Sequence, residues 1–371
     1  MNVLIIGAGP VGLYLGCLLR QRGMDCTVLE KRTARSMHSR SIGIHPPALR
    51  QLEGIGLAKT LVDQGIPVRE GHAFVGDDEL GMLSFSSLPP PFPFVLVLPQ
   101  HITEGVLEDV FESLGDPVQR GVTVSGVESS ENAIRVHCEG PTGQAMWEGN
   151  HVVACDGRRS AIRDLMGIGF SGASYDAHYV MGDFPDTTPF GSRAAIYLGQ
   201  DGLVESFPLP GSVRRWVARV RQPAEAEKAV PLLLDAVSRR TGFGLNAKDC
   251  LMSSSFTAER YEAERFFQGG VALAGDAAHV ISPIGGQGMN LGWMDADWLA
   301  NWFERGAPPP DLDRYDAERR RSFRRAARRS EMNMFMGGAG ALLPLRTALA
   351  RLMLSNSFQP HIARLFSMDR L

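Results

Sequence analysis

A glycine-rich run close to the start of the chain has the spacing of a phosphate-binding turn. The run Gly7-Ala8-Gly9-Pro10-Val11-Gly12 fits the pattern G-x-G-x-x-G. Its glycines permit a tight turn and a close approach of the backbone to a pyrophosphate, and a helix that begins there offers unpaired N–H groups. Glu30 lies about 20 residues further on, where a carboxylate can accept both hydroxyls of an adenosine ribose and would repel a 2′-phosphate. Together these features favour FAD or NAD over NADP at this site.

Two later motifs combine acidic residues with glycines. Cys155-Asp156-Gly157 follows a predicted buried strand at 151–155, and Ser160 can cap the helix after it. Further on, Gly275-Asp276-Ala277-Ala278-His279 leads through Pro283 into Gly285-Gly286-Gln287-Gly288-Met289-Asn290. The sequence predicts a helix that begins near Gly286 to Gly288, whose N–H groups and positive dipole end would face an anionic group.

The predicted elements around the first motif form a β-α-β unit. Residues 3–6 are a continuous apolar run typical of a strand buried on both faces, and 26–29 are a second one. Between them, apolar residues recur at helical spacing until Gly23. Residues 271–274 predict another buried strand. This order is typical of a doubly wound parallel sheet.

Other segments predict different elements. Residues 100–114 have the apolar periodicity of an amphipathic helix, and 122–127 and 133–138 resemble antiparallel strands. From about 169 to 221, short alternating strands separated by Gly- and Pro-rich turns indicate an antiparallel sheet. Along 213–221, Trp216 alternates with Arg215 and Arg219, and we interpret the basic positions as a solvated face.

Composition and charge narrow the class of protein. The 371 residues carry a net charge of −3, so the chain offers no field that attracts nucleic acid. Its 5 cysteines include no C-x-x-C pair, which predicts no metal site and a reducing, cytoplasmic location. Residues 2–19 lack charge, but glycines interrupt the run and no basic segment precedes it, so we expect no stable membrane insertion.

These motifs, in this order, resemble the single-component FAD-dependent aromatic hydroxylases, the p-hydroxybenzoate hydroxylase-like family. The third motif is the most specific, because G-D-A-A-H-x-x-x-P-x-x-G-Q-G-x-N runs without interruption from Gly275 to Asn290. The resemblance also includes Gly7 to Gly12, Glu30, Ser39-Arg40-Ser41-Ile42-Gly43, Gln100 and Asp156-Gly157, and it extends to about residue 300.

The resemblance implies an FAD site. Gly7, Gly9 and Gly12, with Pro10 and Val11, would hold the pyrophosphate, and the helix near Gly286 would stabilise the anion formed when the isoalloxazine is reduced. The remaining implied cofactor contacts are Glu30, Lys31, Arg40, Gln100, Asp156, Gly157, Gly275, Asp276, Pro283, Gly286, Gly288, Met289 and Asn290. The implied flavin-adjacent loop is Pro283, Gly285, Gly286, Gln287 and Gly288.

The implied reaction consumes NADH or NADPH and O2, and a flavin C4a-hydroperoxide hydroxylates an aromatic or polyketide-like small molecule in secondary metabolism or aromatic catabolism. No catalytic acid or base is assigned. The residues that we expect to line the substrate cavity are His72, Tyr197, Phe207, Trp216 and Arg219.

The implied fold is α/β, with a Rossmann-like FAD-binding domain, an inserted antiparallel substrate domain and C-terminal helices. We expect the FAD-binding domain at 1–70, 98–168 and 266–320, the substrate domain at 71–97 and 169–265, and a helical segment at 321–371. A monomer or homodimer is expected, and weak peripheral membrane association stays open.

Other activities remain open at this point. The same fold could carry epoxidation, Baeyer–Villiger oxidation or an oxygen-independent dehydrogenase or reductase, and a flavin-binding redox module without turnover belongs to another class. Assays with and without oxygen separate the oxygen-independent enzymes from the oxygenases.

Overall fold

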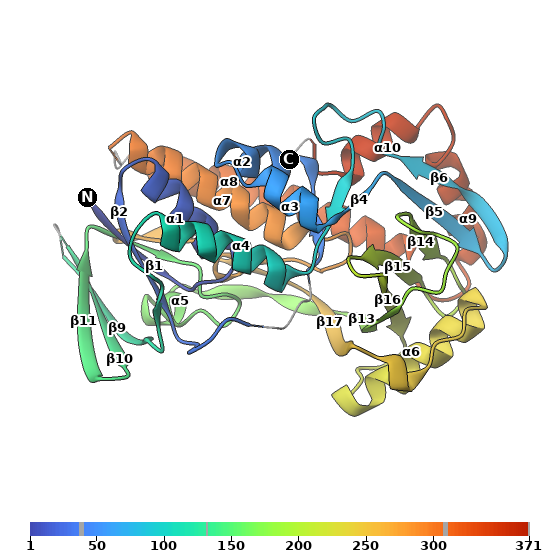
Figure 1. Ribbon diagram of the computed structural model, residues 1–371, viewed down its shortest axis with the longest axis horizontal. Helices are drawn as coiled ribbons and strands as arrows, with labels where there is room; N and C mark the ends of the chain where they lie inside the picture. The colour runs from blue at the N-terminus through green and yellow to red at the C-terminus, as the bar shows by residue number, and fades with distance from the viewer. Residues whose placement is uncertain (37–40, 131–132, 307–310, 370–371) are drawn as a thin grey trace.

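The computed structural model describes residues 1–36, 41–130, 133–306 and 311–369 (Figure 1). Arg40, which the sequence places in the FAD site, lies outside the described residues.

The central sheet is parallel except at one edge and has the order β18-β19-β12-β1-β2-β8. Strand β1 pairs in parallel with β12 and β2, and β12 pairs in parallel with β19. Residues 3–6, 152–154 and 271–273 of its central strands are buried on both faces, as the apolar runs predict. The strands are β1 (Asn2–Ile6), β2 (Asp25–Glu30), β8 (Gln119–Arg120), β12 (His151–Ala154), β18 (Phe267–Gln268) and β19 (Val271–Leu273).

The first glycine of the turn after β1 is fixed by its surroundings. Gly7 has φ of +107°, and a Cβ there would lie 2.5 Å from the carbonyl oxygen of Cys155. Helix α1 (Pro10–Gln21) begins with Pro10 in its first turn and ends before Gly23, whose φ is +71°. The predicted β-α-β unit is therefore confirmed.

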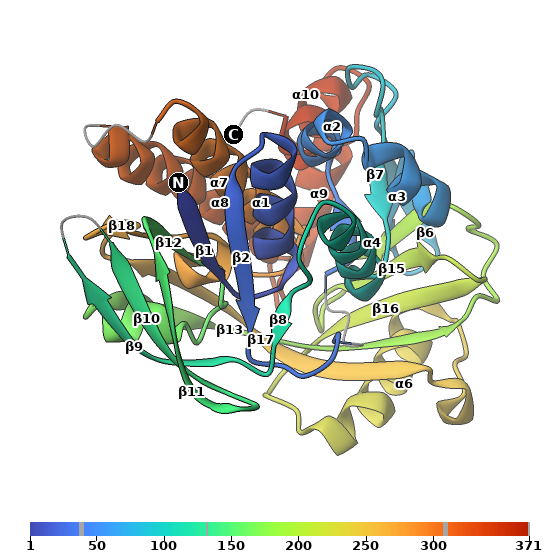
Figure 2. The same cartoon turned by 60° about the vertical axis from the view of Figure 1, so that its left-hand side comes forward.

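Helices and a small antiparallel sheet pack around this central sheet (Figure 2). Helix α1 packs on α4 (Gln100–Ser113) and α7 (Gln287–Glu304), so the predicted helix at 100–114 is confirmed. The small sheet has the order β11-β10-β9 and confirms the antiparallel pair predicted around residue 130. The remaining elements of this region are β9 (Thr123–Ser129), β10 (Ile134–Gly140), β11 (Gly143–Gly149), α2 (Pro46–Gly54), α3 (Ala58–Gln64), α5 (Ala161–Leu165), β3 (Gly43–Ile44), β4 (Ile66–Val68) and β7 (Val95–Val97).

The second large sheet has the order β20-β17-β13-β16-β15-β14-β5-β6. Helix α6 (Ala226–Thr241) covers one of its faces, and the other face looks toward the first sheet and the N-terminal end of α7 (Figures 1 and 2). The sheet joins segments from 70–84 and 170–280. Its strands are β5 (Glu70–Val75), β6 (Asp78–Ser84), β13 (Phe170–Pro185), β14 (Ala194–Tyr197), β15 (Val204–Leu209), β16 (Val213–Val220), β17 (Met252–Ala263) and β20 (His279–Val280).

Three helices end the described chain. Helix α8 (Asp311–Met336) runs beside α7, and α9 (Leu343–Met353) and α10 (Gln359–Phe366) lie beside β6 (Figure 1). Because α8 is continuous, it crosses the boundary that we expected between 320 and 321. No helix in the described part of the chain is long and apolar enough to span a membrane.

Candidate active site

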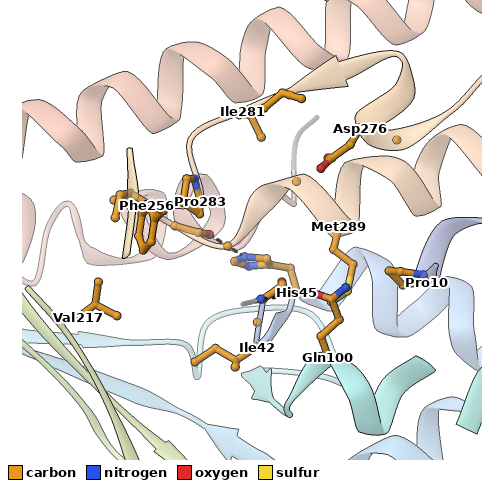
Figure 3. A pocket seen from close by; sticks show the side chains of 18 of the residues that line it. Pro10, Ile42, His45, Gln100, Val217, Phe256, Asp276, Ile281, Pro283 and Met289 are labelled. Atoms are coloured by element: carbon orange, nitrogen blue, oxygen red, sulfur yellow. Dashed lines mark hydrogen bonds between the residues drawn. The ribbon is translucent and has the colours of Figure 1, made fainter. Parts of the chain in front are cut away.

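A single cavity of about 960 Å³ extends from the glycine turn after β1 to the inner face of the second sheet. Figure 3 shows Pro10 and Met289 toward one end, Val217 and Phe256 toward the other, and His45 between them. The cavity therefore brings the nucleotide-type motifs and the antiparallel sheet together.

The glycine turn divides into packing positions and an open position. A Cβ on Gly12 would lie 2.0 Å from the carbonyl oxygen of Gly7, so Gly12 allows the helix to pack on the turn. Gly9 is the N-cap of α1, lines the cavity, and has no atom within 4 Å of a Cβ built on it. Pro10 and Val11 also line the cavity. The space beside Gly9 is where a ligand phosphate could approach the helix N-terminus.

Glu30 ends β2 at the same edge of the cavity. Its Oε2 accepts the backbone N–H of Ala8 at 2.8 Å, and its Oε1 accepts the backbone N–H and the Nε of Arg32 at 2.9 and 3.0 Å. Burial opposes ionisation of this carboxyl, but these donors outweigh burial and hold the pKa of Glu30 below its ordinary value. Glu30 is therefore a fixed carboxylate, and Lys31 beside it also lines the cavity.

Gln100 and Asp156-Gly157 line the cavity from α4 and from the end of β12. The Nε2 of Gln100 donates to Glu104 at 2.8 Å, and its Oε1 accepts the N–H of Ser41 at 3.4 Å. The Oδ2 of Asp156 accepts the N–H of Ile162 at 3.3 Å. Burial raises the pKa of Asp156.

Asp276 projects into the cavity from the short turn after β19 (Figure 3). The surrounding protein raises its pKa by desolvation, against the opposing influence of His279 and Arg158. Gly275 beside it has φ of +60° and packs against Val11. The turn thus places a carboxyl group at the cavity wall, next to the residue that packs on Val11.

The loop before α7 forms the middle of the cavity wall. Helix α7 begins at Gln287 with Gly286 as its N-cap, which confirms the predicted helix start. Pro283, Gly285, Gly286, Gly288 and Met289 line the cavity. Gln287 is buried beneath them.

Asn290 holds this loop rather than lining the cavity. Its Nδ2 donates to the carbonyl oxygens of Gly43 and Gly286 at 2.9 and 2.8 Å, and its Oδ1 accepts the N–H of His45 at 2.8 Å. The amide is thereby occupied by backbone groups. Asn290 joins the start of α7 to β3.

His45 is a cavity residue that the sequence analysis missed. Its Nε2 lies 3.0 Å from the carbonyl oxygen of Gly285, which can only accept, so Nε2 carries the proton and Nδ1 is a bare acceptor. Burial, against that hydrogen bond, lowers the pKa of His45 to about 4. The ring is therefore neutral at pH 7.

A buried ion network beneath the Gly275 turn was also missed. Asp295 of α7 accepts from His279 Nε2 at 2.7 Å, from Arg319 Nε at 2.7 Å and from the N–H of Gly275 at 3.0 Å. All three side chains are buried. Burial opposes its ionisation, but His279 and Arg319 hold the pKa of Asp295 below its ordinary value. The network fixes the turn that carries Asp276.

Only some of the expected substrate residues line the cavity. His72 and Phe207 line the cavity. Tyr197 and Trp216 lie on the opposite face, in the core between the sheet and α6, and this corrects our expectation for them. Side chains alternate along a strand, so the face that α6 covers decides which residues can reach the cavity. Arg219 lies outside the cavity lining and donates to the carbonyl oxygen of Asp176 at 2.9 Å.

The residues that do line the cavity from this sheet are mainly apolar. They include Met181, Ala194, Ile196, Leu198, Leu203 and Val217, together with the charged residues Glu205 and Arg215. Arg215 is buried and forms two hydrogen bonds to Asp183, at 2.7 and 2.8 Å, so the expected solvated basic face is wrong at this position. In the sequence, Glu205 could have been found as the one charged residue at the alternating positions 203, 205 and 207, where its neighbours are Leu203 and Phe207.

Replacing Glu205 by glutamine is expected to stabilise the protein at pH 8 but not at about pH 4. Burial raises the pKa of Glu205 from 4.5 to about 7, so between these values the folded protein holds a proton that the unfolded chain has released. The free energy of unfolding of the wild type therefore falls as the pH rises through this interval. We expect the variant to gain about 2 kcal/mol at pH 8, measured by urea denaturation. An equal pH dependence in wild type and variant would contradict this.

The cavity suits a cofactor that carries a pyrophosphate and several hydroxyl donors. Two buried acceptors at its wall, His45 Nδ1 and Asp156 Oδ1, have no hydrogen-bond partner among the described residues. Buried acceptors of this kind are expensive unless a donor reaches them. With the open space beside Gly9, these atoms fit FAD. Among the described residues, no group of acidic, histidine or cysteine side chains could hold a metal ion.

Comparisons with known proteins agree with this geometry. The family described as FAD binding domain matches residues 1–330. Anhydrotetracycline monooxygenase of Streptomyces rimosus is 33% identical over 337 residues, covering 86% of this chain and 66% of that protein. Dialkyldecalin synthase of Streptomyces rugosporus is 32% identical, covering 96% of this chain and 78% of that protein. The crystal structure of p-nitrophenol 4-monooxygenase PnpA from Pseudomonas putida DLL-E4 superposes with a TM-score of 0.91 at 21% identity, covering 100% of this chain and 98% of that one.

Proposed function

The chain belongs to the family of the FAD binding domain, and from that membership we propose that it is an FAD-dependent monooxygenase. Its reaction would use NADH or NADPH and O2 to hydroxylate an aromatic or polyketide-like small molecule. The observation that carries the proposal is the continuity of one cavity between the motifs that suit FAD and an apolar sheet face that suits an aromatic ring. The relative named anhydrotetracycline monooxygenase supports it, and the chain spans about two thirds of that protein.

The described residues would hold FAD along the length of the cavity. Gly7, Gly9, Pro10 and Val11 would receive the pyrophosphate at the start of α1, and Glu30 and Lys31 the adenosine end. Gln100, Asp156, Gly157 and Asp276 would surround the middle of the cofactor, and the loop Pro283–Met289 its isoalloxazine. Arg40, which lies outside the described residues, stays a proposed contact.

The chemistry that FAD supplies when bound is hydride acceptance from the reduced nicotinamide and transfer of one oxygen atom of O2 to the substrate. The chain's own part is to bind, orient and exclude water. The N–H groups at the start of α7 place partial positive charge beside the loop. The apolar sheet face and the helices α9 and α10 enclose the substrate side, because Met353, Leu354 and Phe366 line the same cavity.

The test is incorporation of labelled oxygen. Purified FAD-loaded protein is incubated with a phenolic or polyketide substrate, NADH or NADPH, and ¹⁸O2, and we expect one labelled oxygen atom in the product and the other in water. Labelled water with ordinary O2 is the control and should leave the product unlabelled. The proposal would be overturned if a substrate stimulated oxidation of NADH or NADPH but no product carried the label. Turnover that proceeds equally without O2 would also overturn it.

We also propose a cytoplasmic protein that acts as a monomer or homodimer. All five cysteines are free thiols, which suits a reducing compartment. No nucleic acid is proposed as a partner because the net charge is close to zero.

A further inference from the structure

Glu205 is a charged residue in the apolar end of the cavity. It lies in β15 between Leu203 and Phe207, which share its face of the sheet, and its register partners are Ile196 on β14 and Val217 on β16. Only 9% of the residue is exposed. A carboxyl group is thus presented to the cavity from a wall whose nearest positions, Leu203, Phe207, Ile196 and Val217, are all apolar.

The loop before α7 lies against this part of the sheet. Ile284 belongs to the same hydrophobic cluster as Leu203, Val217 and Met181. Pro283 and Val217 face the same space in Figure 3. A ring bound between the loop and the sheet would therefore contact the wall that carries Glu205.

Glu205 has no hydrogen bond or ion pair with any residue in the described part of the chain. The cavity carboxylates Glu30, Glu104 and Glu259 differ from it in this respect, because they pair with Arg32, Gln100 and Arg158. Burying a carboxyl group without a partner is costly. Such a group is a candidate for contact with a ligand.

The charged and titratable groups around Glu205 do not neutralise it. On β16, Arg215 is bound to Asp183 and Arg219 donates to a backbone carbonyl. On β13, the hydroxyl of Tyr179 is buried without a partner among the described residues, and burial and then the charge of Glu205 raise its pKa. Three other elements line the cavity beside this wall with uncharged residues. Strand β14 contributes Ile196, the loop before α7 contributes Ile284, and helix α8 contributes Asn333 and Met336.

We propose that Glu205 accepts a hydrogen bond, and in the reaction a proton, from a phenolic or enolic hydroxyl group of the substrate. The inference rests on the proposed function, because it assumes an aromatic alcohol in this cavity. The substrate O–H bond breaks, its electron pair stays on the oxygen, and the proton forms a carboxylic acid at Glu205. The ring becomes more electron-rich and more reactive toward an electrophilic oxygen atom, and the proton returns to the product hydroxyl.

The electrostatics support a proton acceptor that works near neutral pH. Burial raises the pKa of Glu205 to about 7, and a general base is most effective when its pKa lies near the working pH. Above that value the group is a carboxylate that can accept from a phenol, whose own pKa is near 10. Below it the group is already protonated.

The test compares 2-naphthol with its methyl ether, which has no proton to donate. Both are titrated at pH 6 and pH 8 into FAD-loaded protein, and binding is followed by the change in flavin absorbance. A charge-assisted hydrogen bond predicts about a tenfold preference for the phenol at pH 8, and a smaller preference at pH 6. Glu205→Gln and Glu205→Leu should remove the pH dependence of this preference.

The control is Glu139→Gln, the same substitution at an exposed position of β10 in another sheet, which should behave as wild type. Equal binding of phenol and ether by the wild type at pH 8, or an unchanged pH dependence in both Glu205 variants, would overturn the inference. Because the readout is binding, it does not require turnover. Absence of oxygen incorporation would therefore count against the proposed function and leave the result on Glu205 standing.

Discussion

Valine in place of Gly9 is expected to raise the Kd for FAD by about 100-fold or more, because the second glycine of such a turn lets the backbone approach the pyrophosphate. The substitution should leave the protein folded. Gly9 has φ of −82° and ψ of −179°, which any residue adopts, and no atom of the chain lies within 4 Å of the added Cβ. Loss of a favoured N-cap residue should cost the cofactor-free protein about 1 kcal/mol.

The measurement pairs flavin content with stability. Flavin absorbance per mole of purified protein and a titration with FAD give the affinity, and urea denaturation of the cofactor-free protein gives the stability. Gly54→Val is the matched control, since its Cβ also meets open space but Gly54, at the end of α2, does not line the cavity. Unchanged flavin content in Gly9→Val would show that the phosphates bind elsewhere.

Leucine in place of Asp295 is expected to lower the free energy of unfolding by about 3–5 kcal/mol, because it leaves the charge of Arg319 buried without its partner. Asp295 also accepts hydrogen bonds from His279 and from the N–H of Gly275. Its depressed pKa means that its contribution is present at neutral pH and is lost only as the pH falls below the ordinary range of a carboxyl group. Denaturation by urea at pH 7 measures the loss.

Two further variants separate the ion network from simple loss of a polar side chain. Asp297→Asn, on the same helix, should change the free energy of unfolding by less than about 1 kcal/mol. Burial raises the pKa of Asp297, so its negative charge contributes little to stability and its loss costs little. The double variant Asp295→Leu with Arg319→Leu should recover part of the loss, since no unpaired charge remains. If the double variant lost as much stability as the two single variants Asp295→Leu and Arg319→Leu together, the network would be contradicted.

The parts of the structure that could be predicted from sequence are those set by local geometry. The glycine turn, the start of α7 and the antiparallel pair β9 and β10 each depend on residues within a few positions, where steric limits and periodicity act directly. The continuous helix α8 was harder, because its charged residues carry no boundary signal at 320.

The parts that could not be predicted depend on which faces meet in space. Trp216 and Glu205 belong to neighbouring strands with similar alternation, and only the position of α6 decides that Trp216 enters the core and Glu205 the cavity. The network of Asp295 with His279 and Arg319 joins residues 16 and 24 positions apart, and no local pattern marks them as partners.

The order in which the strands join their sheets has a consequence for how the protein is made. The chain leaves the first sheet after β2 and contributes β5 and β6 to the second. It returns with β8 and β12, leaves again with β13 to β17, returns with β18 and β19, and adds β20 to the second sheet. One of the two partners of β5 is β14, more than a hundred residues later, and β12 pairs with β19 at Val271–Leu273. Neither sheet can be completed before these later strands have been synthesised. During most of its synthesis the nascent chain therefore carries strands whose edges have no hydrogen-bonding partner.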